Sequence, residues 1–78
     1  MSNQKIDGTK YGFPSGMSQP SLRALLDAGY DSLEAVAAAT PRQLLDLHGM
    51  GPKGVRLLRE ALAARGMSFA GEEARGRS

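Results

Sequence analysis

The sequence contains no cysteine and no tryptophan, and only two tyrosines and two phenylalanines among its 78 residues. Without cysteine, neither a disulfide framework nor thiolate-bound zinc can stabilise the fold. Because aromatic side chains are so few, we expect a core of leucine, valine, methionine and alanine. His48 is the single histidine, so we expect no metal site and no cofactor.

Long apolar segments and catalytic patterns are also missing. No apolar run approaches the roughly 20 residues of a membrane span, and residues 1–10 lack the apolar stretch of a signal peptide. The acidic residues show no paired catalytic spacing, and the serines show no nucleophile–base arrangement. We therefore expect a single soluble domain, monomeric and cytoplasmic (nucleoid-associated if bacterial), that is not an enzyme and has no membrane partner.

The net charge is only +2, but the positive charge is unevenly distributed. Residues 41–65 contain five basic and two acidic side chains, whereas residues 16–40 contain one basic and three acidic side chains. An anionic partner such as nucleic acid would therefore bind the second half of the chain.

The two ends are polar and lack periodicity. We predict a disordered segment over residues 1–10, a folded domain over residues 11–69 and a disordered tail over residues 70–78. Tyr11 and Phe13 lie in a Gly- and Pro-containing segment and are expected to cover an edge of the core.

Between these ends the pattern predicts an all-α, compact bundle of four short helices. Ser18 or Gln19 caps the first helix, Pro20 lies in its first turn, and Gly29 ends it. The buried stripe of this helix has i, i+3, i+4 spacing and consists of Leu22, Leu25 and Leu26.

The second and third helices each have a predicted capping box, in which side chains three residues apart satisfy the free backbone N–H groups. Asp31 with Glu34 is expected to start the second helix. Thr40 with Gln43 is expected to start the third, which would run over residues 41–48 and partly bury Leu44, Leu45 and Leu47.

The fourth helix is predicted from Pro52 to about Arg65, with a stop at Gly66. Met67 and Phe69 are expected to fold back against the core. The apolar face of this helix consists of Val55, Leu58, Ala61 and Leu62.

Two segments of the chain resemble each other. Residues 16–23, GMSQPSLR, can be laid over residues 49–56, GMGPKGVR, so that Gly, Met and Arg match. The match is either a coincidence in a Leu- and Ala-rich chain or a duplicated hairpin-plus-helix unit. In the second case the first hairpin is degenerate, because YGFPSG replaces its leading helix.

The second hairpin has the composition of a phosphate-binding turn. Gly49 can adopt positive φ, and Gly51 lets a phosphate approach the main chain at the start of a helix, where free N–H groups and the helix dipole favour anions. Met50 is expected to point inward and anchor the turn. Lys53, Arg56 and Arg59 suggest one basic face, and Gly54 would let a backbone or a ribose come close.

We therefore predict DNA binding, through backbone and sugar contacts that position the protein without reading the sequence. The predicted contact residues are His48, Gly49, Met50, Gly51, Lys53, Gly54 and Arg56. A secondary set on the first hairpin is Gly16, Ser18, Gln19 and Arg23.

Two other interpretations stay open. The glycines can serve only the geometry of a tight turn between helices. The domain can also bind another protein, in which case Leu57 and Met17 would form the contact patch.

Residues 44–62, LLDLHGMGPKGVRLLREAL, resemble the helix-hairpin-helix family, and residues 18–69 resemble the C-terminal domain of the bacterial RNA polymerase alpha subunit. The resemblance implies a SAM-like helical fold that contacts the DNA minor groove. Gly51 and Lys53 fall on DNA-contacting positions of that domain, and Gly54 stands where it has a serine. Met17 and Pro20 replace its DNA-contacting arginine and asparagine, and Leu57 replaces an acidic residue used with partner proteins.

Overall fold

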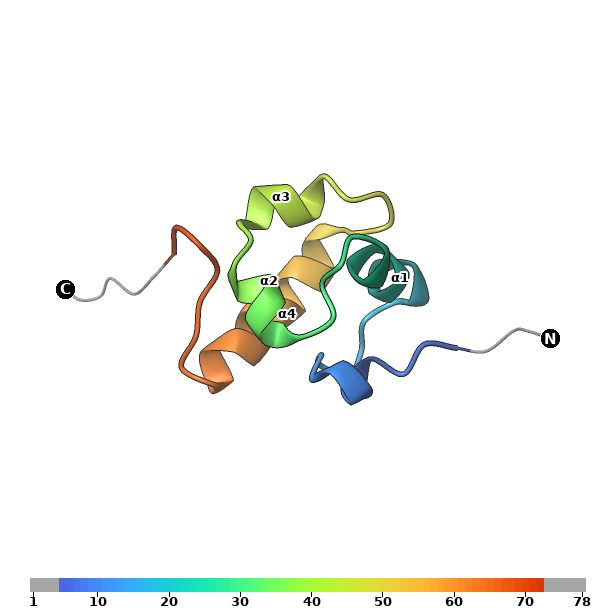
Figure 1. Ribbon diagram of the computed structural model, residues 1–78, viewed down its shortest axis with the longest axis horizontal. Helices are drawn as coiled ribbons and strands as arrows, with labels where there is room; N and C mark the ends of the chain where they lie inside the picture. The colour runs from blue at the N-terminus through green and yellow to red at the C-terminus, as the bar shows by residue number, and fades with distance from the viewer. Residues whose placement is uncertain (1–4, 73–78) are drawn as a thin grey trace.

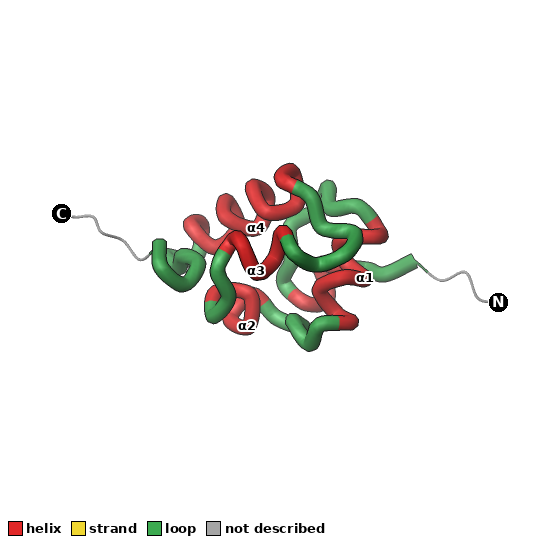
Figure 2. Tube along the Cα trace, turned by 90° about the horizontal axis from the view of Figure 1, so that it is seen from above, coloured by secondary structure: helices red, strands yellow, loops and turns green. Residues whose placement is uncertain are grey.

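The computed structural model describes residues 5–72, and these residues contain helices and turns but no strand. The elements are η1 (Gly8–Tyr11, a 3-10 turn), α1 (Gln19–Asp27), α2 (Leu33–Ala37), α3 (Pro41–Leu45) and α4 (Pro52–Ala64). In Figures 1 and 2, α2 and α3 pack against α4, and α1 lies at the end of the molecule near the N-terminus. The predicted all-α bundle of four helices is confirmed.

The core is mainly aliphatic, as expected, but it also contains both phenylalanines, Phe13 and Phe69. Its completely buried side chains are Leu25, Val36, Leu44, Leu58, Leu62 and Phe69. Each contributes about 1.5–3 kcal/mol through the removal of apolar surface from water. Phe69 lies beyond α4 and fills the space that the short helices leave, which confirms that the chain folds back after Gly66.

Two of the predicted helix starts are confirmed in detail. The Ser18 hydroxyl accepts a hydrogen bond from the Ser21 N–H at the start of α1. Thr40 and Gln43 form the complete capping box of α3. Gly29, after α1, has φ of +91°, as its predicted role as a helix stop requires.

The predicted cap of α2 is wrong. Ser32, not Asp31, has the extended backbone of an N-cap residue, and its hydroxyl accepts a hydrogen bond from the Ala35 N–H. Because α2 begins at Leu33, Asp31 lies one residue too early to reach a free N–H group. Glu34 instead lies in the first turn, where its charge is favourable toward the helix dipole.

The third helix is shorter than predicted. It ends at Leu45 rather than near residue 48, because the chain continues in single turns in which Leu47 N–H bonds Leu44 O and Met50 N–H bonds Leu47 O. Leu44 is fully buried, whereas Leu45 is 45% exposed to solvent.

The packed region begins before the expected boundary at residue 10. Ile6 packs against the core, and η1 is capped by Asp7, whose carboxylate accepts hydrogen bonds from the hydroxyl and N–H of Thr9. These two bonds lower the pKa of Asp7 below its usual value, and the bond from the Thr9 hydroxyl has the larger effect. Gly8 is buried so closely against Leu22 that an added Cβ would lie 2.7 Å from Leu22 Cδ2.

Contacts with the folded domain also continue beyond residue 69, where the sequence predicted the domain to end. Ala70 N–H bonds Ala39 O in the turn after α2, and Glu72 forms an ion pair with Arg59 of α4. The part of the predicted tail over residues 73–78 lies outside the described residues. The helices of residues 5–72 are all too short or too polar to cross a membrane.

Candidate nucleic-acid interface

The two glycine–methionine turns are structural copies of each other. Gly16 and Gly49 both have positive φ, of +93° and +98°. Two residues later, Ser18 and Gly51 are the extended N-caps of α1 and α4. The segments match in register at both of these positions, which supports a duplicated unit over a coincidence.

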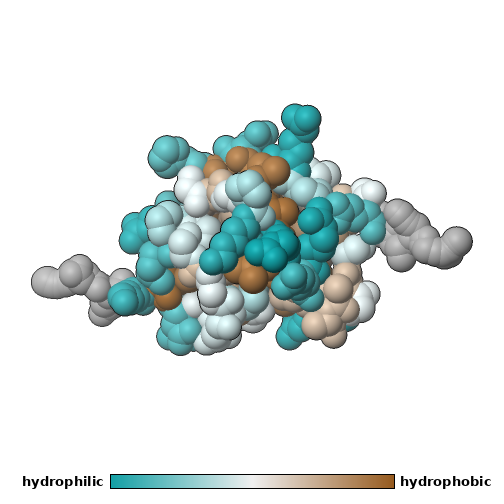
Figure 3. All heavy atoms as spheres, turned by 180° about the vertical axis from the view of Figure 1, so that it is seen from behind, coloured by the Kyte–Doolittle hydropathy of each residue, from teal (hydrophilic) through white to brown (hydrophobic). Residues whose placement is uncertain are grey.

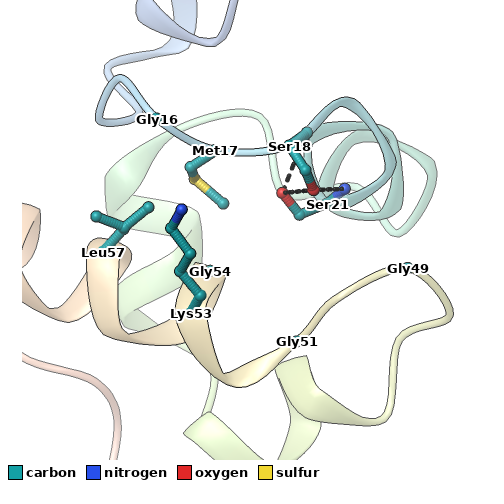
Figure 4. A pocket seen from close by; sticks show the side chains of 9 residues that line it. All are labelled: Gly16, Met17, Ser18, Ser21, Gly49, Gly51, Lys53, Gly54 and Leu57. Carbon is teal, nitrogen blue, oxygen red and sulfur yellow. Dashed lines mark hydrogen bonds between the residues drawn. The ribbon is translucent and has the colours of Figure 1, made fainter.

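The two units pack directly on one another at the starts of α1 and α4. A Cβ built on Gly54 would lie 2.9 Å from Met50 Sδ, 3.5 Å from Met17 Cε and 3.7 Å from Ser21 Cβ. Ser21 and Gly54 are equivalent positions of the two units, so the helices meet at corresponding points (Figure 4). The absence of a side chain at Gly54 therefore lets the hairpins come together.

Each turn also contacts the helix of the other unit. A Cβ on Gly49 would lie 2.8 Å from the carbonyl oxygen of Pro20 in α1, and one on Gly16 would lie 3.8 Å from Leu57 Cδ1 in α4. This reciprocal arrangement leaves a groove of about 250 Å³ between the hairpins. It is lined by Gly16, Met17, Ser18, Ser21, Gly49, Gly51, Lys53, Gly54 and Leu57.

The second hairpin has backbone donors without an acceptor in the described part of the chain, at the start of α4. Gly51 has no side chain to cap α4, and Pro52 has no N–H group. Val55 N–H bonds Gly51 O, but the structure gives the N–H groups of Lys53 and Gly54 no hydrogen-bond acceptor among residues 5–72. These donors lie at the positive end of a helix of 13 residues, which is the arrangement that binds anions.

The first hairpin is closed by side chains of the protein itself. The Ser18 hydroxyl caps Ser21 N–H, and the Ser21 hydroxyl donates to Ser18 O at 2.8 Å. The amide of Gln19 makes two hydrogen bonds with the backbone of Ile6, at 2.7 and 2.9 Å. The polar groups of Ser18 and Gln19, two members of the predicted secondary set, are therefore already used within the fold.

The predicted basic face is smaller than the sequence indicated. Lys53 and Arg56 are exposed, and neither forms an ion pair within the described part of the chain. Arg59, in contrast, makes two hydrogen bonds to the Glu72 carboxylate and lies 5.5 Å from the centre of the Phe69 ring. These bonds raise the pKa of Arg59 and neutralise its charge locally, so Arg59 stabilises the C-terminal segment.

The remaining basic candidates lie on the other side of Gly49. Arg23 and His48 are both exposed and line a hollow together with Pro20, Ala24, Gly49 and the acidic Asp27. The structure therefore brings one residue of the predicted secondary set, Arg23, next to two residues of the primary set. Gly16, the last of the secondary set, lines the groove.

Two predicted contact residues have packing roles. Met50 is only 8% exposed, which confirms that it points inward. Gly54 was expected to let a backbone or a ribose approach, and its side-chain position faces Met50 and Met17 within the protein.

Sequence reasoning missed two groups that shape the interface. Ser21 is 2% exposed and is bonded to Ser18, a pairing that the Ser-x-x-Ser spacing could have indicated. The bonds from Ile6 to Gln19 join residues far apart in the chain. No local sequence pattern predicts these two hydrogen bonds.

Two hairpins in matching conformation, packed through their helix starts, define a duplicated helical-hairpin module. The chain belongs to the SAM-like helix-hairpin-helix tandem family, whose model matches residues 15–64. The match begins at the first turn and ends with α4, so it includes both units. No curated protein and no solved structure matches the chain.

Proposed function

We propose that this protein binds duplex DNA through the sugar–phosphate backbone, mainly with its second hairpin and without reading the base sequence. The observation that carries the proposal is the uncapped start of α4, where the N–H groups of Lys53 and Gly54 have no acceptor within residues 5–72. A phosphate oxygen would supply that acceptor, and the unpaired charges of Lys53 and Arg56 favour an anion there.

The family supports the same class of partner, since helix-hairpin-helix domains bind nucleic acids or proteins. The resemblance of residues 18–69 to the polymerase alpha C-terminal domain suggests the minor groove as the place of contact. Because Met17 and Pro20 replace the arginine and asparagine with which that domain contacts DNA, we propose generic binding rather than promoter recognition. We propose no catalytic role.

The test is a titration of isotope-labelled protein with a short mixed-sequence duplex, followed residue by residue by NMR at two salt concentrations. Amide shifts are expected at Gly49, Gly51, Lys53 and Arg56, with binding that weakens as salt rises. Lys53→Gln should lower the slope of log K against log[salt] by about 1. If the shifts avoid the second hairpin, or no shift occurs, the proposal is wrong.

Arg65→Gln is the matched control. It removes one positive charge at the C-cap of the same helix, about 18 Å from Lys53 at 1.5 Å per residue. Arg65 is exposed and lies 3.9 Å from the Glu34 carboxylate, so its charge is partly balanced within the protein. The control should keep the wild-type slope, which separates a local phosphate contact from an effect of net charge.

A second candidate function is protein binding, favoured by the apolar side of the groove. Met17 and Leu57 lie side by side there, and both are half-buried (Figure 4). Figure 3 shows that apolar surface elsewhere on one face is divided into small patches by polar side chains. A protein partner would be retained after nuclease treatment and lost on Leu57→Gln, whereas DNA-dependent capture would disappear with nuclease.

A further inference from the structure

We infer that the segment after α4 is an autoinhibitory strap, whose Glu72 carboxylate occupies Arg59 and keeps this arginine out of the nucleic-acid interface. The strap consists of residues 67–72, where the chain turns back after α4 (Figure 1). This inference rests on the proposed function and deepens it, because it names an internal competitor that limits how many phosphates α4 contacts.

The strap is anchored through its buried part. Phe69 is completely buried in the core, and Ala70 N–H bonds Ala39 O at 3.0 Å. The chain then turns, because Glu72 N–H bonds Phe69 O at 2.9 Å and Gly71 has φ of +84°. This turn brings the acidic side chain of Glu72 to α4 on a segment that the core holds in place.

The ion pair between the strap and α4 has the geometry in which arginine also binds phosphate. Arg59 Nε and Nη2 donate to the two carboxylate oxygens of Glu72, at 3.0 and 2.7 Å. The planar guanidinium binds carboxylate and phosphate oxygens in this same two-point manner. Glu72 therefore occupies the donors that a phosphate would need, and the two contacts exclude each other.

Arg59 would extend the basic surface of α4 if Glu72 were absent. It lies three residues after Arg56, and residues at this spacing are neighbours on the surface of a helix. Its guanidinium lies 5.5 Å from the centre of the Phe69 ring, a cation–π contact that does not depend on Glu72. Removal of the carboxylate alone should therefore leave an arginine that is still positioned beside Arg56.

The ion pair is accessible and contributes little to the stability of the fold. The side chains of Arg59 and Glu72 are 48% and 36% exposed. Ion pairs exposed to this degree are weak and are screened by salt. Because Phe69 anchors the strap in the core, we expect the protein to stay folded when Glu72 no longer binds Arg59.

The test measures the salt dependence of binding to the mixed-sequence DNA duplex by fluorescence anisotropy. Glu72→Gln should steepen the slope of log K against log[salt] by about 1, because one more phosphate is contacted. Between about 50 and 200 mM salt this variant should lose about three- to fourfold more affinity than the wild type. In NMR titrations the Arg59 Nε–H signal should shift with DNA in Glu72→Gln and stay in place in the wild type. A wild-type slope in Glu72→Gln overturns the inference.

Two further variants separate the contact from an effect of net charge. Glu34→Gln also removes one acidic charge from an exposed ion pair, with Arg65 at 3.9 Å, and should keep the wild-type slope. The double variant Arg59→Gln/Glu72→Gln should also return to the wild-type slope, because the released arginine is gone. A steeper slope in either variant overturns the inference.

Gly71→Ala tests the strap without any change of charge. The φ of +84° at Gly71 is unfavourable for alanine, so the turn that carries Glu72 should open and the slope should steepen. Gly29→Ala is the matched control, because Gly29 has a similar φ, of +91°, in the turn after α1. Circular dichroism checks that the variants fold. A wild-type slope in Gly71→Ala overturns the inference.

The failures of the two proposals are distinguishable. If neither the wild type nor Glu72→Gln binds the duplex, the proposed function is wrong and the inference with it. If both bind through the second hairpin with the same slope, the proposed function stands and only the autoinhibitory role of Glu72 is refuted.

Discussion

Gly49 is subject to two separate constraints at the turn of the second hairpin. Its φ of +98° lies in the left-handed region that side chains disfavour, and its Cβ position is 2.8 Å from the Pro20 carbonyl oxygen. Gly66, after α4, has φ of +74° but no atom within 4 Å of its Cβ position. The two glycines therefore separate the cost of the backbone conformation from the cost of the contact.

Gly66→Ala should lower the free energy of unfolding by about 1–2 kcal/mol, the cost of a left-handed alanine. Gly49→Ala should cost this amount and about 1–3 kcal/mol more, because the backbone of Pro20 must move to make room. Urea unfolding of both variants measures the difference. Equal losses of unfolding free energy in the two variants would show that α1 shifts without cost. The turn would then not fix the position of the two hairpins.

For single residues, the sequence predicts the backbone conformation better than it predicts contacts with remote parts of the chain. Positive φ at Gly29 and Gly66 follows from their position directly after helices, because a glycine stop is a local feature. Gly49 also has positive φ, but it lies in the turns that follow α3 and not at the end of that helix. The function of Gly54 does not follow, since a glycine in the first turn of a helix can face either a ligand or the other hairpin. The decisive atoms, from Met17 and Ser21, are remote in the chain.

The helices are short and depend on their caps. Thr40 with Gln43 was predictable because the third helix begins with proline, which fixes the register of the capping box. The second helix has no such marker, and two adjacent residues, Asp31 and Ser32, are both good caps. The structure selects Ser32, which places Leu33 and Val36 in the core.

This selection can be tested by a pair of alanine variants. Ser32→Ala should lower the free energy of unfolding by about 1 kcal/mol, because the Ala35 N–H loses its acceptor. Asp31→Ala should change it by less than about 0.5 kcal/mol, since Asp31 is exposed and caps nothing. Thermal and urea unfolding measure both. A larger effect at Asp31 would mean that α2 begins one residue earlier in solution.

In the whole molecule, the duplication has produced two unequal hairpins. Both hairpins have a glycine with positive φ followed two residues later by an extended N-cap. The match of residues 16–23 with 49–56 indicated this copy but left a coincidence open. The inequality could be predicted only in part. The missing leading helix is visible in YGFPSG, but the closure of the first hairpin depends on Ile6 and Ser21, and the loss of Arg59 from the basic face depends on Glu72. These are tertiary contacts without a local signal.

This inequality predicts how strongly binding depends on salt. If only the second hairpin contacts about two or three phosphates, log K should fall against log[salt] with a slope of about −2 to −3. Equal use of both hairpins would give about twice that slope. Arg56→Gln should make the slope shallower by about 1. Arg59→Gln is the control one helical turn further on: its charge is already paired with Glu72, so the slope should stay unchanged. A shallower slope in Arg59→Gln would mean that DNA displaces the C-terminal segment from α4.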